Sequence, residues 1–154
     1  MVKKFIPSRK SSSRKGDNGI VLVVGGLCIY HGAPVLSSIP ALKCGSHLVY
    51  TCVPKINVSP TRAISPNLIV IPLVDQKLTR GAVNKLVGVL PLNLDSATIG
   101  MGLAIQDRNS LLQLVKSLLD RDVRLSLDAS ALVPEILPLL KDKNVVVTPH
   151  AGEF

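Results

Sequence analysis

The strongest constraint on the fold is a series of short apolar runs that alternate with helical stretches from Gly19 onward. The runs are rich in Val, Ile and Leu, and most of them end at Gly, Pro or Asp. They span residues 20–24, 48–53, 68–71, 97–99, 123–127 and 145–147. Such runs are typical of strands in a parallel sheet that is covered on both faces, and their alternation with helices is typical of βαβ units. The sequence therefore predicts an α/β fold with a mostly parallel sheet and helices on both faces.

Helices are expected between most of these strands. Proline is favoured in a first helical turn, so one helix is predicted from Pro34 to Gly45, with a kink at Pro40 where a backbone donor is missing. The other predicted helices run from a Thr79 cap to about Leu86, from an Asp107 or Asn109 cap to Leu119, and from Ala131 to Leu140.

The net charge of +8 does not indicate a nucleic-acid-binding protein. Residues 1–15 hold six Lys or Arg and no acid, whereas the rest holds twelve basic and ten acidic residues. The excess charge therefore belongs to a basic leader, which is expected to be a flexible tail, and the folded domain is expected to span residues 16–154. Aromatic residues that stack on bases are only 3% of the chain and include no Trp.

Membrane insertion and secretion are not expected either. No apolar run reaches the roughly 18–20 residues of a membrane span, and the basic N-terminus is not followed by the apolar stretch of a secretory signal. The three cysteines, Cys28, Cys44 and Cys52, form no CxxC pair, which is typical of reduced thiols and predicts a cytoplasmic location. Neither these cysteines nor the three histidines have metal-ligand spacing, so no metal site is predicted.

Three groups of residues follow predicted strands, at the edge where open α/β sheets bind ligands. The first is Gly25-Gly26 with the helix start near Ala33, the second is Gly100-Met101-Gly102, and the third combines Asp128 with Thr148-Pro149-His150. Glycines let a ligand approach the backbone, and a helix N-terminus offers N–H groups to an anion. Each group also has an ordinary structural explanation, as a tight turn, a helix cap or a loop-bonding histidine. From these residues alone, the chain is interpreted as a nucleotide-type α/β binding domain.

Four motifs containing these groups occur in the order expected of one family. They are KGDNGIVLVVGGLCIYHGAPVL (Lys15 to Leu36), IGMGL (Ile99 to Leu103), LDASAL (Leu127 to Leu132) and TPHAGEF (Thr148 to Phe154). Together they resemble the motifs KGxxGxVLVIGGS…GAP, IGPGL, LDADAL and TPHPGEF of the ATP- or ADP-dependent NAD(P)H-hydrate dehydratases, in an archaeal-looking variant. The resemblance implies a ribokinase-like three-layer sandwich, incomplete at its C-terminus, with residues 16–154 as the N-terminal part of the domain.

The resemblance also implies an activity and a set of binding residues. Members of this family restore NADH or NADPH from the hydrated, damaged cofactor, with ATP or ADP as phosphoryl donor, together with Mg²⁺. A nucleotide phosphorylates the ring hydroxyl, which turns a poor leaving group into a good one. By analogy, Ala33, Gly102 and His150 would line the pocket for hydrated NAD(P)H, with Gly25, Gly26, Gly100 and Asp128 as supporting residues.

Several positions depart from the family pattern. Leu27, Met101, Ser130 and Ala151 stand where the family usually has serine, proline, aspartate and proline, respectively. The sequence also contains no GTGD, the motif that carries the family's nucleotide-phosphate loop and catalytic aspartate. No catalytic residue is therefore assigned, the sheet edge after Val147 is expected to be open, and this polypeptide alone is predicted to lack dehydratase activity.

Two other functions remain open at this point. The first is a small-molecule kinase of the same fold. The second is a non-catalytic half that pairs its open sheet edge with another chain, and family members commonly form homo-oligomers.

Overall fold

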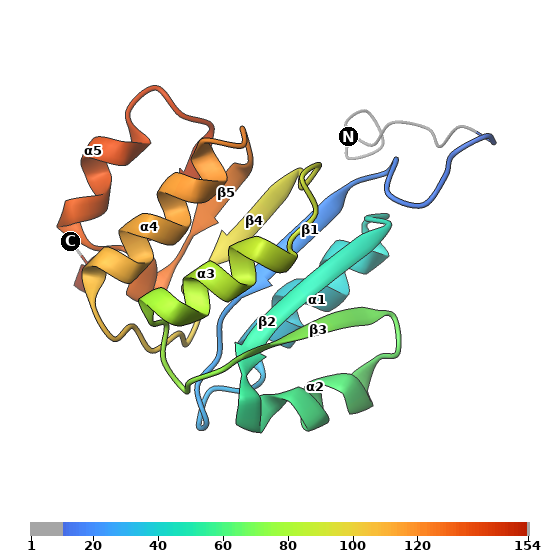
Figure 1. The fold of residues 1–154 in the computed structure, drawn as a ribbon, viewed down its shortest axis with the longest axis horizontal. Helices are drawn as coiled ribbons and strands as arrows, with labels where there is room; N and C mark the ends of the chain where they lie inside the picture. Colours follow the sequence, from blue (N-terminus) through green and yellow to red (C-terminus); the bar gives the residue numbers. More distant parts are fainter. Residues whose placement is uncertain (1–10, 154) are drawn as a thin grey trace.

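Six parallel strands form a single sheet at the centre of the protein (Figure 1). The structure is a computed structural model that describes residues 11–153. The strands are β1 (Ile20–Val24), β2 (Leu48–Pro54), β3 (Leu68–Leu73), β4 (Ser96–Ile99), β5 (Arg124–Leu127) and β6 (Val145–Val147). Their order across the sheet is β3-β2-β1-β4-β5-β6. The α/β class and the parallel sheet predicted from the apolar runs are confirmed.

The strand order places a switch point between β1 and β4. The chain builds the sheet outward from β1 through β2 to β3, returns to the other side of β1, and continues through β4, β5 and β6. In open α/β sheets the crevice outside the carboxyl ends of the strands at such a point is the usual ligand site.

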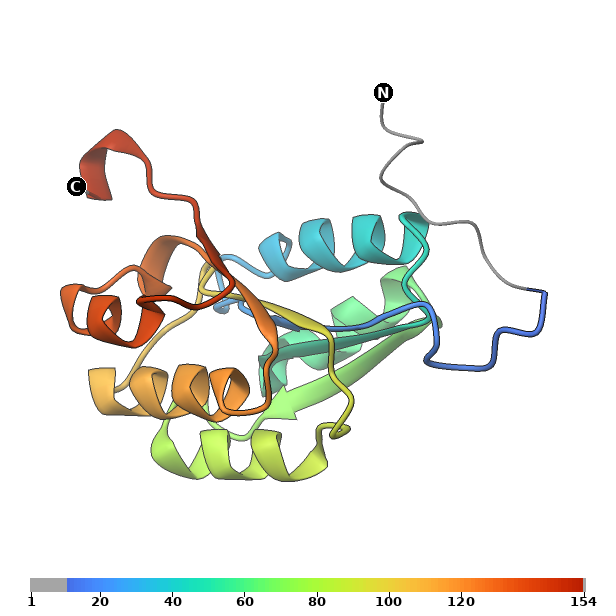
Figure 2. The ribbon, with the colours of Figure 1, turned by 90° about the horizontal axis from the view of Figure 1, so that it is seen from above.

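Helices cover both faces of the sheet, which makes three layers (Figure 2). On one face lie α1 (Ala33–Lys43) and α2 (Val58–Ile64), and on the other lie α3 (Arg80–Val89) and α4 (Arg108–Leu119). The shorter elements are η2 (Lys55–Asn57), η3 (Ala129–Ala131), η4 (Pro134–Ile136), α5 (Leu137–Leu140) and η5 (Ala151–Glu153). The predicted arrangement of helices on both faces is therefore confirmed.

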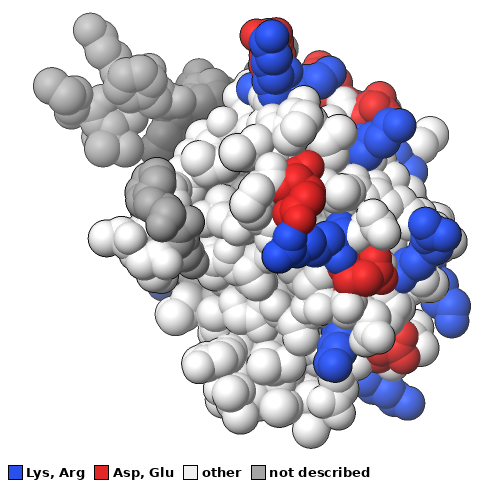
Figure 3. Space-filling model, turned by 90° about the vertical axis from the view of Figure 1, so that its left-hand side faces the viewer, with Lys and Arg blue, Asp and Glu red and all other residues white. Residues whose placement is uncertain are grey.

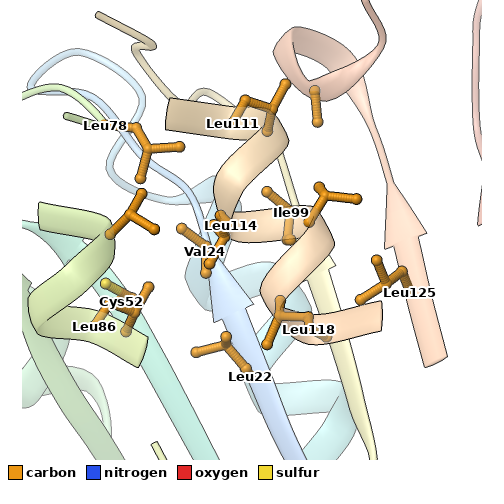
Figure 4. Close-up of a cluster of buried hydrophobic side chains, with 14 of the residues drawn as sticks. Leu22, Val24, Cys52, Leu78, Leu86, Ile99, Leu111, Leu114, Leu118 and Leu125 are labelled. Atoms are coloured by element: carbon orange, nitrogen blue, oxygen red, sulfur yellow. The ribbon is translucent and has the colours of Figure 1, made fainter. Parts of the chain in front are cut away.

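The larger part of the core lies between the sheet and the α3–α4 pair (Figure 4). Leu111, Leu114 and Leu118 on one side of α4 are fully buried, as expected from the apolar face of this segment. They pack with strand residues such as Leu22 and Ile99. Burying each such side chain contributes about 1.5–3 kcal/mol, so this layer holds the strands in register.

Two helices begin at the caps that the sequence indicates. The Thr79 hydroxyl accepts a hydrogen bond from the Ala82 N–H at 3.2 Å, and the Asp107 carboxylate accepts one from the Ser110 N–H at 2.9 Å. Of the two caps considered for α4, Asp107 and Asn109, Asp107 is therefore the one used. The first helix continues through Pro40 as a single element and ends at Lys43, before Gly45.

The helix predicted over residues 131–140 is wrong. The structure has two 3₁₀ turns, η3 and η4, followed by the one-turn α5. Pro134 and Pro138 each lack an N–H, and a proline disfavours the helical conformation in the residue before it. Val133 is accordingly extended, with φ −118° and ψ 143°.

The helix α2 was not predicted from the sequence. Its segment contains Pro60 and no acidic residue in its first turn, so neither a cap nor an apolar period marks it. Pro60 is nevertheless compatible with the helix because the N–H groups of a first helical turn have no partner within the helix.

The strand β6 is a second correction. The run Val145–Val147 forms a parallel strand as predicted, but it lies at the edge of the sheet and is not covered on both faces. Val146 and Val147 are 58% and 44% exposed, and β5 is the only strand that pairs with β6 within residues 11–153. The open apolar edge expected after Val147 is therefore present.

The described part of the basic leader meets the domain near residue 16. His47 is half-buried, and its Nδ1 accepts a hydrogen bond from the Gly16 N–H at 3.1 Å. The domain boundary after residue 15 stays a prediction, since residues 1–10 of the leader lie outside the described residues.

Candidate functional site

Two glycine loops meet at the switch point of the sheet. The loop after β1 contains Gly25 and Gly26, and the loop after β4 contains Gly100 and Gly102. The Gly26 N–H donates to the Met101 carbonyl at 2.9 Å, which joins the two loops directly. The structure thus brings together Gly102, predicted to line the pocket, and Gly25, Gly26 and Gly100, predicted to support it.

The contact between these loops requires glycine at two positions above all. Gly102 has a φ of +64°, and a Cβ on it would lie 2.8 Å from the Tyr30 Cβ and 3.7 Å from the Gly26 Cα. Gly25 is buried, and a Cβ there would lie 2.6 Å from the Met101 carbonyl oxygen. Real Cβ atoms essentially never approach closer than 3.0 Å, so a side chain at either position would push the loops apart.

A third loop, after β5, packs against the loop after β4. Gly100 has a φ of +122°, and a Cβ on it would lie 1.8 Å from the Asp128 carbonyl oxygen. The Ser130 hydroxyl lies 2.7 Å from the carbonyl oxygens of both Gly100 and Leu103. Ala129, which lies between Asp128 and Ser130 in the chain, has a φ of +46°, a conformation that is uncommon for residues other than glycine.

The position of Ser130 explains how this chain accommodates its departure from the LDADAL pattern. A hydroxyl has one proton, which it can share between the two carbonyl oxygens that face it, whereas an ionised carboxylate is only an acceptor. Serine is therefore the residue type that satisfies the loop in this structure, and it links β5 to the glycine loop after β4.

Ala33 begins α1 next to the first glycine loop. It follows the N-cap residue Gly32, and no side chain caps the helix. The Ala33 side chain packs against the smaller core cluster, which includes Val23 and Met101. A ligand at this point would therefore meet the small residue and the backbone of the first helical turn, as expected for a site that admits an anion or a sugar.

Asp128 and His150 lie at the same edge of the sheet, toward β6. The Thr148 hydroxyl donates to Asp128 Oδ1 at 2.7 Å, and the Thr148 N–H donates to the Leu127 carbonyl at 3.1 Å. Thus the side chain of Asp128 fixes the segment that leads to His150. His150 is exposed, and its Nδ1 accepts a hydrogen bond from the Gly152 N–H at 3.0 Å.

His150 is not next to the glycine loops. Its segment follows β6, and β5 separates β6 from β4. At about 4.8 Å between neighbouring strands, β6 lies roughly 10 Å from β4. The structure therefore places His150 at the same edge as Gly102 but brings the two into no described contact, and a shared pocket for them stays a prediction.

The sequence analysis missed Asn57, a buried residue that also belongs to this edge. Its Nδ2 donates to the Leu27 carbonyl at 2.9 Å, and it would lie 3.4 Å from a Cβ on Gly26. Asn57 thus fixes the loop after β1 from the side of β2. The available signal was its place shortly after the second predicted strand, at the edge where site residues gather.

An apolar hollow of about 250 Å³ lies beside β6. Its lining is formed by Leu132, Val133, Pro134, Ile136, Leu137, Leu140, Val147 and Pro149. The molecular surface seen from this side is largely uncharged over a broad area (Figure 3). The hollow is next to the segment of His150 in the sequence, but it carries no side chain that is suited to acid–base chemistry.

Three further findings concern the described residues. Among residues 11–153, no group of three or more His, Cys, Asp or Glu side chains is arranged to hold a metal ion. Burial raises the pKa of the Cys52 thiol far above its usual range, so this group is not a thiolate nucleophile. Within the same residues, no helix is long and apolar enough to cross a membrane.

The strand order and the paired glycine loops define the class of the protein. A doubly wound parallel sheet with glycines after the strands at its switch point is typical of α/β proteins that bind nucleotides or related cofactors. Within that class, residues 21–154 match the NAD(P)H-hydrate dehydratase family model, and the chain belongs to this family.

Two curated relatives match over nearly the whole chain. It is 82% identical to an ADP-dependent (S)-NAD(P)H-hydrate dehydratase of Nitrosopumilus maritimus over 100% of this chain and 54% of that protein. It is 66% identical to a protein of the same name from Cenarchaeum symbiosum over 99% of this chain and 53% of that protein. The chain therefore spans about half the length of these relatives.

Solved structures confirm the ribokinase-like fold. A ribokinase-like superfamily protein from Enterococcus faecalis matches with a TM-score of 0.73 and 27% identity, over 96% of this chain and 51% of that one. An ADP/ATP-dependent NAD(P)H-hydrate dehydratase from Bacillus subtilis, co-crystallised with ATP and Mg²⁺, matches with a TM-score of 0.71 and 25% identity, over 96% and 50%.

Proposed function

We propose that this chain supplies the glycine-lined part of the substrate site of an ADP-dependent (S)-NAD(P)H-hydrate dehydratase. The observation that carries the proposal is the direct contact between the loops after β1 and β4, which places Gly26 and Gly102 side by side at the switch point. Glycine has no side chain of its own, so its backbone can come close to a sugar or a pyrophosphate at the point where α/β sheets bind such groups.

The site residues divide into two kinds under this proposal. Gly102 and the start of α1 at Ala33, which are both partly exposed, form the surface that the dinucleotide contacts. Gly25, Gly26, Gly100 and Asp128 act through them, because they hold the three loops against one another. His150, at the far side of the same edge, is proposed to hydrogen-bond a phosphate or ribose group through its exposed ring.

The nucleotide donor is proposed to be ADP because both of the relatives described above are ADP-dependent. The nucleotide would supply a phosphoryl group that turns the ring hydroxyl of the hydrate into a good leaving group. The described residues are better suited to binding the dinucleotide than to transferring the phosphoryl group. The sequence has no GTGD, and the described residues offer no cluster of carboxylates for Mg²⁺. The residues that position the phosphoryl group are therefore proposed to come from the part of the relatives' length that this chain does not span.

Two assays on the purified chain test this proposal. Isothermal titration with (S)-NADH hydrate should show binding, which Gly102→Ala should abolish and Gly81→Ala should not. A Cβ has open space at Gly81 but meets the Tyr30 Cβ at Gly102. Absence of binding to the unaltered chain would refute the proposed site.

The second assay follows the recovery of NADH absorbance in the presence of ADP and Mg²⁺. We expect no measurable dehydration by this chain alone, with the Nitrosopumilus maritimus relative as the positive control. A measurable rate would contradict the assignment of phosphoryl transfer to residues outside this chain.

A further inference from the structure

A second hollow, lined in part by two basic side chains, lies after the carboxyl end of β2, on the same edge of the sheet as the proposed dinucleotide site. It has a volume of about 380 Å³ and lies between the η2–α2 segment and β3. Its lining is formed by Lys55, Val58, Ser59, Arg62 and Pro72. Along η2 and α2, Val58 and Ser59 each lie three or four residues from both Lys55 and Arg62, so the four residues share one face of this helical segment.

The hollow is connected to the glycine loop through a short chain of contacts. Lys55 directly follows Pro54, the last residue of β2, and β2 is the neighbour of β1 in the sheet. Asn57 lies in the same 3₁₀ turn as Lys55, and its side chain donates to the carbonyl of Leu27, the residue that follows Gly26. Lys55 and the glycine loop after β1 therefore lie at the same carboxyl edge of the sheet, joined through Asn57.

The charge of this half of the protein favours an anion. From Asn18 to Val74 the sequence contains Lys43, Lys55 and Arg62 but no Asp or Glu. No carboxylate lines the hollow, and both of its cations are exposed. An anion there would meet a lysine, an arginine and the Ser59 hydroxyl, which are the donor types that bind phosphate.

The place of the hollow in the sheet indicates which phosphate it would take. In doubly wound dinucleotide-binding folds, a carboxylate beyond the glycine motif selects the free ribose 2′-hydroxyl, whereas a nearby cation accommodates a 2′-phosphate. Here the residue after β2 is Lys55, and this half of the sheet has no carboxylate to repel the phosphate.

We propose that Lys55 and Arg62 form a subsite for the ribose 2′-phosphate, so that the protein prefers hydrated NADPH to hydrated NADH. This inference rests on the proposed function and adds a specificity determinant to it. The two exposed cations set the preference between the two substrates and leave the contacts of the shared dinucleotide unchanged.

The test compares binding of the two hydrates by titration to the protein and to a Lys55→Gln, Arg62→Gln double variant. We expect the double variant to lose affinity for (S)-NADPH hydrate by about tenfold, as estimated for two exposed charge contacts. Its affinity for (S)-NADH hydrate should stay within about twofold of the unaltered value. Lys43→Gln is the matched control, since Lys43 is an exposed cation of the same acid-free stretch that does not line the hollow.

Salt adds an independent readout, because contacts between exposed charges are screened as ionic strength rises. The preference for the NADPH hydrate should fall between 50 mM and 500 mM NaCl in the unaltered protein, and should be small throughout in the double variant. Equal binding of both hydrates by the unaltered protein, or an equal loss of both in the double variant, would overturn the subsite and leave the proposed function standing. A loss of ADP affinity alone would assign the cations to the nucleotide and also overturn it. Failure to bind either hydrate would overturn both proposals.

Discussion

The Gly100→Ala variant gives the most quantitative of the predictions, because Gly100 lies very close to the loop after β5. The new Cβ would lie 1.8 Å from the Asp128 carbonyl oxygen, whereas real Cβ atoms essentially never approach closer than 3.0 Å. The two loops would have to separate by about 1.2 Å. Overpacking of this kind costs about 1–3 kcal/mol, and a non-glycine residue at a φ of +122° adds about 1–3 kcal/mol of backbone strain. We expect a total loss of about 2–6 kcal/mol in the free energy of unfolding.

Urea unfolding followed by circular dichroism measures this loss, and a thermal melt should show a decrease in Tm of roughly 5–20 °C. Gly88→Ala is the matched control. Gly88 lies inside α3, where an added Cβ meets nothing within 4 Å, so alanine should stabilise the protein by about 0.5–1 kcal/mol. If Gly100→Ala unfolded at the same urea concentration as the unaltered protein, the packing between the loops after β4 and β5 would be incorrectly described.

Two further predictions concern titratable groups away from the site. Cys52 is buried, which raises the pKa of its thiol, whereas Cys28 and Cys44 are exposed. A thiol-reactive disulfide reagent at pH 8 should therefore label two thiols of the native protein and all three after unfolding, and fast labelling of a third native thiol would refute the burial. The hydroxyl and N–H of Ser110 lower the pKa of the Asp107 carboxyl, so its capping adds stability above the carboxyl's unfolded pKa and is lost as the pH falls through the folded value. Asparagine at position 107 caps comparably but does not titrate. As the pH falls below about 4, the free energy of unfolding should therefore decrease less in Asp107→Asn than in the unaltered protein. Identical dependence of the two unfolding free energies on pH would contradict this.

The sequence predicted the strands better than the connections between them. All six apolar runs form parallel strands because β-branched and leucine-rich segments bury well in a covered sheet. Local patterns failed at α2, where a first-turn proline hid a real helix, and over residues 131–140, where two prolines broke an apolar stretch into short turns. The exposure of β6 could not be predicted either, since burial depends on what packs against a strand and not on its own composition.

The candidate site was predicted in part. Glycines in the loops after strands made Gly26 and Gly102 candidates, and the structure brings them together because parallel strands have their carboxyl ends at one edge of the sheet. The same reasoning could not give the distance between them and His150, which depends on the order of the strands. Nor could it find Asn57 and Lys55, whose relation to the glycine loop arises from a 3₁₀ turn that has no clear sequence pattern.

Amide hydrogen exchange with and without (S)-NADPH hydrate tests the central claim most directly, because it locates the ligand without requiring turnover. We expect the hydrate to slow exchange in two separate stretches, residues 25–33 and residues 100–103, which meet through the hydrogen bond from the Gly26 N–H to the Met101 carbonyl. Unchanged exchange in both stretches, or protection confined to the helices α3 and α4, would show that the switch point does not bind the damaged cofactor.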